Sequence, residues 1–226
     1  MAHAAISTAL GPQTGNSRVK QVGVVIVWAG VVTLAVLFVL KYVLFYFRHY
    51  DPVSFDVYWP RRGWLFLHLS GGTVALLTGP FQFWSGLRRR NMKLHRWIGR
   101  LFLAGVAIGV SGSVALIVKT GNGWAFETGL VGLALAWATT AAIAYLCIRR
   151  GLVDLHKEWM IRAYVVTFAF VTFRFLEDYS PMSRLRPEND RDITIAWACW
   201  VVPLAITELI LQIKRMNTAL AARQAR

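Results

Sequence analysis

The sequence predicts an all-α integral membrane protein, a bundle of about six transmembrane helices with both termini in the cytoplasm. Of the 226 residues, 56% are hydrophobic and 16% are charged, and the mean hydropathy is +0.48. Soluble domains are about 45–50% apolar and about 25% charged. The apolar residues also form long blocks, with the charges gathered between them. These two observations exclude a secreted disulfide scaffold, a disordered chain and an ordinary soluble enzyme.

Six blocks are long enough to cross a bilayer, since a crossing helix takes about 20 mostly apolar residues. They are Gln21 to Phe47, Trp64 to Trp84, Ile98 to Val118, Thr128 to Ile148, Trp159 to Leu176, and Ile193 to Ile213. None shows the alternation of a membrane β-strand. The predicted organisation is therefore a cytoplasmic tail (1–20), a first helix (21–47), a five-helix core (64–213) and a basic cytoplasmic tail (214–226).

The distribution of lysine and arginine sets the orientation, because cytoplasmic loops are enriched in both. With the N-terminus inside, fifteen of the 25 basic residues lie on the inner side: Arg18, Lys20, Arg88, Arg89, Arg90, Lys93, Arg96, Arg100, Arg149, Arg150, Lys157, Lys214, Arg215, Arg223 and Arg226. The outer side holds Arg48, Arg61, Arg62, Lys119, Arg184, Arg186 and Arg191. The net charge of +14 thus indicates topology, and no nucleic-acid partner is expected. We expect a multi-pass protein of a bacterial inner membrane.

Small residues and one proline predict how the helices pack. Two blocks carry a stripe of small residues that lets membrane helices approach closely: Gly105, Gly109 and Gly112 in the third, and Gly129, Gly132 and Ala136 in the fourth. The Gly79-Pro80 pair should kink or loosen the second block and free a backbone carbonyl near Leu76.

Charged residues within the blocks predict ion pairs. Arg162 lies one turn into the fifth block and Glu208 at a similar depth in the antiparallel sixth, so the two can pair if these helices touch. Arg174 precedes Glu177 and Asp178 by three and four residues, the helical spacing for a local ion pair. Lys41 lies near the end of the first block, where its long side chain can reach the interface. We interpret these pairs as locking the bundle, with a proton relay as the alternative.

Three histidines are the candidate site residues, because ionisable groups inside a membrane are costly. His68 lies about one turn into the second block, above Gly71 and Gly72, which leave space for a planar cofactor or for a close helix. His95 and His156 both precede helices that start at the cytoplasmic face, where helix N-termini favour negative charge. They have Gln82, Arg96, Arg100 and Arg162 nearby in the predicted topology. This group suits a haem propionate, a quinone oxygen or a lipid phosphate, and interfacial or packing roles remain the alternative.

Three stretches together resemble a known family. They are His68 followed by Gly71-Gly72 and Gly79-Pro80-Phe81-Gln82-Phe83; the run HRWIGR from His95 to Arg100; and HKEWMIRAY from His156 to Tyr164, ending at Phe173-Arg174. In this order they resemble the predicted membrane proteins catalogued as domain of unknown function 2306, over roughly residues 64 to 212. The resemblance implies a multi-span membrane protein with these His and Arg positions as its signature. It supplies no activity.

The leading functional hypothesis is a protein that binds haem b or a quinone, in electron transfer or as a subunit of a membrane redox complex. His95 and His156 would be metal ligands only if haem is bound, and His68 would form a separate outer site. The alternatives are a non-catalytic assembly subunit, with other membrane subunits or a second copy as partner, and a small-solute transporter whose only support is Gly79, Pro80 and Pro203. No Walker loop, GxGxxG, HExxH or CxxC motif is present.

Overall fold

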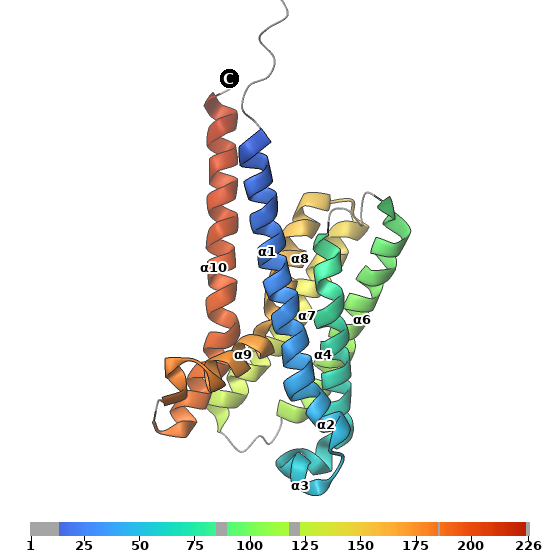
Figure 1. Ribbon diagram of the computed structural model, residues 1–226, viewed down its shortest axis with the longest axis vertical. Coiled ribbons are helices and arrows are strands. Elements are labelled where there is room, and N and C mark those ends of the chain that lie inside the picture. Colours follow the sequence, from blue (N-terminus) through green and yellow to red (C-terminus); the bar gives the residue numbers. More distant parts are fainter. Residues whose placement is uncertain (1–13, 85–89, 118–122, 185, 225–226) are drawn as a thin grey trace, which may run out of the picture.

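The computed structural model describes residues 14–84, 90–117, 123–184 and 186–224, with side chains from residue 22 onward. Every regular element in this part of the chain is helical (Figure 1). The long helices are α1 (Thr14–Phe38), α4 (Arg62–Phe83), α6 (Met92–Ile117), α7 (Trp124–Arg149), α8 (Val153–Thr167), α9 (Ala169–Asp178) and α10 (Glu188–Gln224). The short elements are the π-helix η1 (Val39–Val43), α2 (Leu44–Arg48), α3 (Pro52–Phe55), and the 3-10 helices η2 (Asp56–Arg61) and η3 (Pro181–Arg184).

Five segments are long and apolar enough to cross a membrane: Val22–Arg48, Met92–Ile117, Trp124–Arg149, Val153–Asp178 and Glu188–Gln224. They coincide with five of the six predicted spans. The remaining predicted span, the second block from Trp64 to Trp84, forms α4 but is not among these five segments. Its 22 residues include His68, Ser70, two threonines, Gln82 and four glycines, which lower its hydropathy. The beginning of α1 and the end of α10 lie at one end of the bundle, the top of Figure 1.

The helices extend beyond several predicted boundaries. Helix starts at Thr14, so part of the expected N-terminal tail is helical, and α10 continues to Gln224 through the expected C-terminal tail. The predictions for Arg88, Arg89, Lys119, Arg226 and residues 1–13 lie outside the described residues, as do those for the side chains of Arg18 and Lys20.

Helices α4 and α6 pack backbone against backbone. A Cβ atom added at Gly71 would lie 2.4 Å from the Gly109 nitrogen, and one added at Gly112 would lie 2.5 Å from the His68 nitrogen. A Cβ at Gly105 would lie 2.8 Å from the Ala75 nitrogen. The stripe on the third block therefore does bring two membrane helices into close contact. It also fills the space beside Gly71 that a planar cofactor would need.

The glycines of α7 serve a different purpose from those of α6. A Cβ at Gly129 would lie 3.0 Å from Nε1 of Trp197, and one at Gly132 would lie 2.9 Å from Cζ2 of Trp200. These glycines accommodate two indole rings of α10 rather than another backbone. The Trp197 indole also donates a hydrogen bond to the Ala125 carbonyl, 3.1 Å away. The packing of α10 on α7 is therefore made by large side chains set into small residues.

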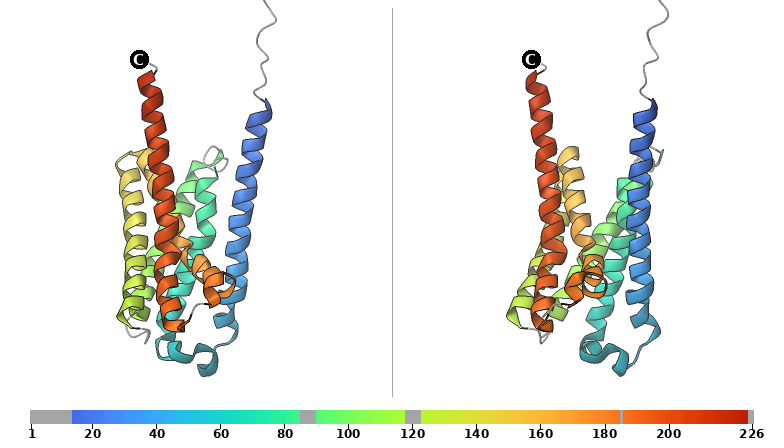
Figure 2. Two further views of the ribbon diagram at one scale, coloured as in Figure 1. Left: turned by 90° about the vertical axis from the view of Figure 1, so that its left-hand side faces the viewer. Right: turned by 60° about the vertical axis from the view of Figure 1, so that its left-hand side comes forward.

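The fifth predicted span is not one continuous helix. It breaks at Phe168 into α8 and α9, and α9 runs across the bundle rather than along it (Figures 1 and 2). Two hydrogen bonds meet at the Thr167 hydroxyl, which donates to the Ala163 carbonyl at 2.7 Å and accepts from the Trp137 indole at 2.8 Å. A threonine hydroxyl bonded to the carbonyl four residues earlier bends helices. The break thus coincides with a pair of side-chain hydrogen bonds in the core.

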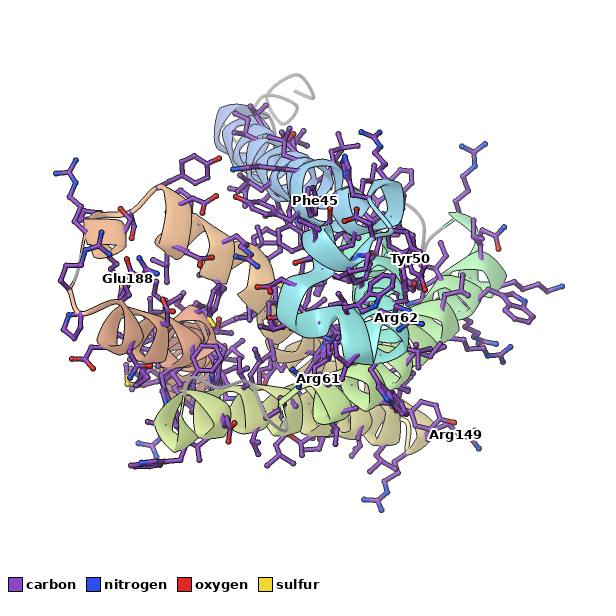
Figure 3. The ribbon with its side chains drawn as sticks, turned by 90° about the horizontal axis from the view of Figure 1, so that it is seen from below. Phe45, Tyr50, Arg61, Arg62, Arg149 and Glu188 are labelled. Atoms are coloured by element: carbon purple, nitrogen blue, oxygen red, sulfur yellow. The ribbon has the colours of Figure 1, made fainter. Side chains whose placement is uncertain are left out.

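The main core lies among α4, α6, α7 and α8, around fully buried Phe102, Ala144 and Ala163. The lower end of the bundle has its own aromatic cluster, in which buried Phe55 contacts Tyr46, Tyr50, Trp59 and Phe66. Figure 3 looks onto this end, where Tyr50, Arg61 and Arg62 lie close to one another. The Arg62 guanidinium donates to the Tyr50 hydroxyl at 2.8 Å, and that of Arg61 donates to the Leu116 carbonyl at 3.0 Å. Arg61 thus fastens the predicted outer loop to α6, and Arg62 ties the start of α4 to Tyr50 within that loop.

Candidate functional site in the membrane bundle

His68 lies on α4 and faces the interior of the bundle. Its Nδ1 is 2.9 Å from the Gly109 carbonyl oxygen. A carbonyl only accepts, so Nδ1 carries the hydrogen and Nε2 is the remaining ring nitrogen. The ring meets Phe170 and Trp137 edge to face, with centroids 5.1 and 6.5 Å away. The arrangement resembles that of ligand-binding histidines, in which one nitrogen is fixed by a backbone carbonyl and the other is presented to a ligand.

The two histidines predicted for the cytoplasmic face rest on different neighbours. Nδ1 of His156, on α8, is 2.8 Å from the Ala144 carbonyl oxygen of α7. His95, on α6, lies beside α4, where Nε2 of Gln82 is 3.5 Å from the His95 carbonyl oxygen. Within the described ranges no group of three or more His, Cys, Asp or Glu is arranged to hold a metal ion.

Gln82 is a contact between helices in this structure. Its side chain is buried, and a Cβ added at Gly99 would lie 3.1 Å from its Oε1. The amide thus fills the space left by a glycine of the HRWIGR run. In the same run, Arg96 and Arg100 are exposed, and the Arg100 guanidinium stacks on Trp97 at 5.0 Å. The run contributes one packing position, at Gly99, and two basic side chains on the surface.

Arg162 is buried and bonded to α10. Its Nε and Nη2 donate to one carboxylate oxygen of Glu208 at 2.9 and 2.6 Å, and its side chain is 8% exposed. Nη1 lies 3.7 Å from the Glu158 carboxylate, and the guanidinium stacks on Trp159 at 4.7 Å. Arg162 and Glu208 therefore pair across the two helices as the sequence predicts. The group predicted around Arg162 is divided, because Arg162 faces α10 whereas Arg96 and Arg100 are exposed on α6.

A network extends from this pair along α10. Gln212 donates to the second Glu208 oxygen at 2.6 Å, and Arg215 binds both oxygens of Glu158, one of them at 3.2 Å. Each carboxylate thus has more than one donor. The charge of Arg162 is balanced within the protein by these side chains.

The predicted partners of Arg174 need one correction. Arg174 pairs with Glu177 at 2.5 Å, but Asp178 instead accepts hydrogen bonds from Lys41 at 3.0 Å and from the Tyr42 hydroxyl. The π-helix η1 lets two consecutive side chains, Lys41 and Tyr42, reach one carboxylate. Lys41 was expected to reach the interface with its long side chain, and its role in joining η1, which continues α1, to α9 was missed. The signal was absent from the sequence, because a π-turn has no clear sequence pattern.

The Leu76 carbonyl, which Pro80 leaves without its helical donor, accepts a hydrogen bond from a side chain of another helix. The Tyr164 hydroxyl of α8 donates to the Leu76 carbonyl oxygen at 3.2 Å, and Tyr164 is buried. A Cβ at Gly79 would lie 2.1 Å from the Tyr164 ring, so only glycine leaves room for it. The sequence predicted the freed carbonyl, but not its partner. The nearest signal was the presence of a tyrosine in HKEWMIRAY.

Comparison with known proteins shows which family the chain belongs to. The family described as Predicted membrane protein (DUF2306) matches residues 65–211. The chain belongs to this family. No protein with a curated description matches it, and no solved structure does. The family region contains His68, His95, His156 and Arg162, whereas α1 and the last part of α10 lie outside it.

Proposed function

We propose that the protein binds a redox-active ring, a quinone in the first place, at the His68 imidazole. One observation carries the proposal: inside the bundle, Nδ1 of His68 is fixed on the Gly109 carbonyl while Nε2 is left for a ligand. An ionisable side chain at such a position is a functional candidate by default. The edges of Phe170 and Trp137 beside it suit an aromatic ring.

The residues fit a quinone better than a haem. A haem with two axial imidazoles needs a second histidine facing His68, and the rings that contact His68 are those of Phe170 and Trp137. The glycine contacts of α4 with α6 also leave no room at Gly71 for a macrocycle. A quinone supplies two-electron, two-proton chemistry, and its reduced form, the quinol, needs only one hydrogen-bond acceptor from a side chain. A neutral His68 would accept that bond at Nε2 from a quinol hydroxyl, while Gly109 holds the tautomer.

The amount of quinone that co-purifies with the protein tests this proposal. Full-length protein extracted in mild detergent should carry quinone that organic solvent releases, and His68→Ala should lose it in protein that remains folded by circular dichroism. The matched control is His49→Ala, because His49 also bonds a backbone carbonyl, at 3.1 Å, but is exposed. A protein with neither extractable quinone nor a Soret band contradicts the proposal. A Soret band that His68→Ala removes would assign haem b to the same imidazole.

An assembly subunit is the second candidate function. It is favoured by the use of Gln82, His156, Arg162 and Tyr164 between helices, which explains much of the family signature by packing alone. Co-purification of a partner in fixed ratio, with no bound ligand, supports it. The transporter alternative loses its main argument, because the carbonyl freed by Pro80 is bonded to Tyr164 and joins two helices.

A further inference from the structure

The outward face of α10 carries a heptad seam. Large apolar side chains recur at intervals of four, three, four, three and four residues, and each is at least 44% exposed: Val202, Ile206, Leu209, Ile213, Met216 and Leu220. In heptad notation Ile206, Ile213 and Leu220 take position a, and Val202, Leu209 and Met216 take position d. Such alternation over several turns is the pattern of helices that pack side by side.

The seam points away from the protein's own bundle. The inward face of α10 holds buried Leu211 and the ion pairs of Glu208 and Arg215. The left view of Figure 2 looks onto the side of α10 that no other described element covers. The seam is therefore available to a partner.

Lipid alone does not account for this face. At about 1.5 Å per residue, the 37 residues of α10 extend about 55 Å, well beyond the roughly 30 Å of hydrocarbon. In Figure 1 α10 rises beyond the other helices of the core. The predicted span ends at Ile213, and Lys214, Arg215, Asn217 and Thr218 follow. Met216 and Leu220 continue the seam where lipid tails no longer cover it.

The flanking positions fit a second copy of the same chain. Identical chains in one bilayer share an orientation, so their α10 helices would lie parallel. Positions e and g then face each other, and they hold no charge between residues 203 and 224: Pro203, Ala205, Ile210, Gln212, Asn217, Ala219 and Gln224. The charges of Glu208, Lys214 and Arg215 fall at b and c, away from the seam, and Arg223, at the next d position, ends it. Two of the three a positions are isoleucine, and β-branched residues at a with leucine at d, as at Ile206 and Leu209, favour two strands.

We propose that the protein forms a parallel homodimer through α10, with residues 202–220 of two copies packed along this seam. The surface extends beyond residue 211, where the family region ends, so the dimer contact is in part a property of this chain outside that region. The proposal is independent of any ligand at His68.

Cysteine cross-linking in native membranes tests the dimer. Met216→Cys places a thiol at a d position, and Thr218→Cys places one at f, on the opposite face. The native Cys147 and Cys199 are buried, so they can remain. Mild oxidation should give a disulfide-linked species of twice the chain mass about tenfold faster for Met216→Cys than for Thr218→Cys. Scanning residues 213 to 220 should give maxima at 213, 216 and 220.

A second measurement does not depend on cysteines. Two full-length copies with different tags are co-expressed, one copy is purified through its tag, and the amount of the other copy that co-purifies is measured. Replacing Ile213 and Met216 by glutamine should lower the captured fraction about tenfold, a loss of about 1.4 kcal/mol. The matched control, Lys214→Gln with Thr218→Gln, changes exposed positions off the seam and should leave capture unchanged. Equal cross-linking at all positions, a product of another mass, or equal capture by both variant pairs overturns the proposal.

Discussion

The hydroxyl of Tyr164 on α8 donates to the carbonyl oxygen of Leu76 on α4, 3.2 Å away. This carbonyl lies four residues before Pro80, where the helix has lost its own donor. Because Gly79 leaves space for the ring, one side chain both satisfies the broken helix and fills the gap beside it. The proline and the tyrosine, 84 residues apart in the sequence, therefore act as one structural unit.

Tyr164→Phe should destabilise the protein by about 1 to 3 kcal/mol, because it leaves a buried carbonyl without a donor while keeping the ring. Gly79→Ala should be more harmful, since the new Cβ would overlap the Tyr164 ring. The double variant Gly79→Ala with Tyr164→Ala should recover part of that loss. Thermal unfolding in detergent measures all three, and a Tyr164→Phe protein as stable as the wild type would contradict the role of the hydroxyl.

The contact of α4 with α6 predicts opposite outcomes at two adjacent glycines. Gly71→Ala would place a Cβ 2.4 Å from the Gly109 nitrogen and should prevent close packing, with a large fall in folded yield. Gly72→Ala has nothing within 4 Å of the new Cβ. It should be neutral or stabilise the helix by up to about 1 kcal/mol. Yield and melting temperature in detergent compare the two, and equal effects would show that α4 and α6 do not pack this way.

Breaking the ion pair of Arg162 with Glu208 should lower the free energy of unfolding more than replacing both residues by apolar ones. Glu208→Gln leaves the buried guanidinium without its main partner and should destabilise by about 1 to 3 kcal/mol. Replacing Arg162 by Met together with Glu208→Leu should cost less than Glu208→Gln alone. Arg215→Gln, which removes an ion pair nearer the surface, should cost at most about 1 kcal/mol. A double-mutant cycle on unfolding free energies gives the coupling energy between Arg162 and Glu208. A coupling energy near zero would refute a stabilising interaction between them.

Lys41 should hold α1 against α9. Its ammonium bonds Asp178 at 3.0 Å and the Tyr179 hydroxyl at 2.8 Å, whereas α1 is otherwise sparsely covered by the bundle. Lys41→Met should increase hydrogen exchange in α1 and leave that of α6 and α7 unchanged. Lys20→Met, near the other end of α1, serves as the control. Unchanged exchange in α1 would show that other contacts fix this helix.

Acid should loosen the turn at the lower end of the bundle. The Asp51 carboxylate accepts from the backbone N–H of Ser54 at 2.9 Å and from its hydroxyl at 2.8 Å, and these bonds hold the pKa of Asp51 below its usual range. The cap of α3 therefore contributes fully above the unfolded pKa of about 3.9 and is lost as the pH falls through the lower, folded pKa. Amide exchange in α3 should rise at acid pH. Asp51→Asn should abolish this dependence, because asparagine caps without titrating.

Much of the fold could be predicted because the signals are local in sequence. Hydropathy and length located the helices, and the glycine spacing of the third block predicted its close contact with another helix. The depths of Arg162 and Glu208 from their helix ends predicted a pair without knowledge of the fold. Each of these rests on helix geometry, which a sequence displays directly.

What could not be predicted depends on contacts between distant residues. The break at Phe168 has no proline or glycine nearby, and next to it the Thr167 hydroxyl bonds both Ala163 and Trp137. The pair of Lys41 and Asp178 joins residues 137 positions apart through a π-turn. The joint site expected of His95 and His156 stays a prediction, since Nδ1 of His156 bonds the Ala144 carbonyl of α7 while the His95 backbone carbonyl lies near Gln82 of α4.

The glycine contact between α4 and α6 also decides which parts of the protein can move. Two backbones in direct contact have no side chains between them that could change rotamer, so these helices must shift as a single rigid body. Helix α10 is held instead by indole rings and by ion pairs, which can exchange partners. Motion of α10 against the bundle should therefore meet less resistance than motion of α4 against α6, and α10 is the helix whose outer face carries the heptad seam.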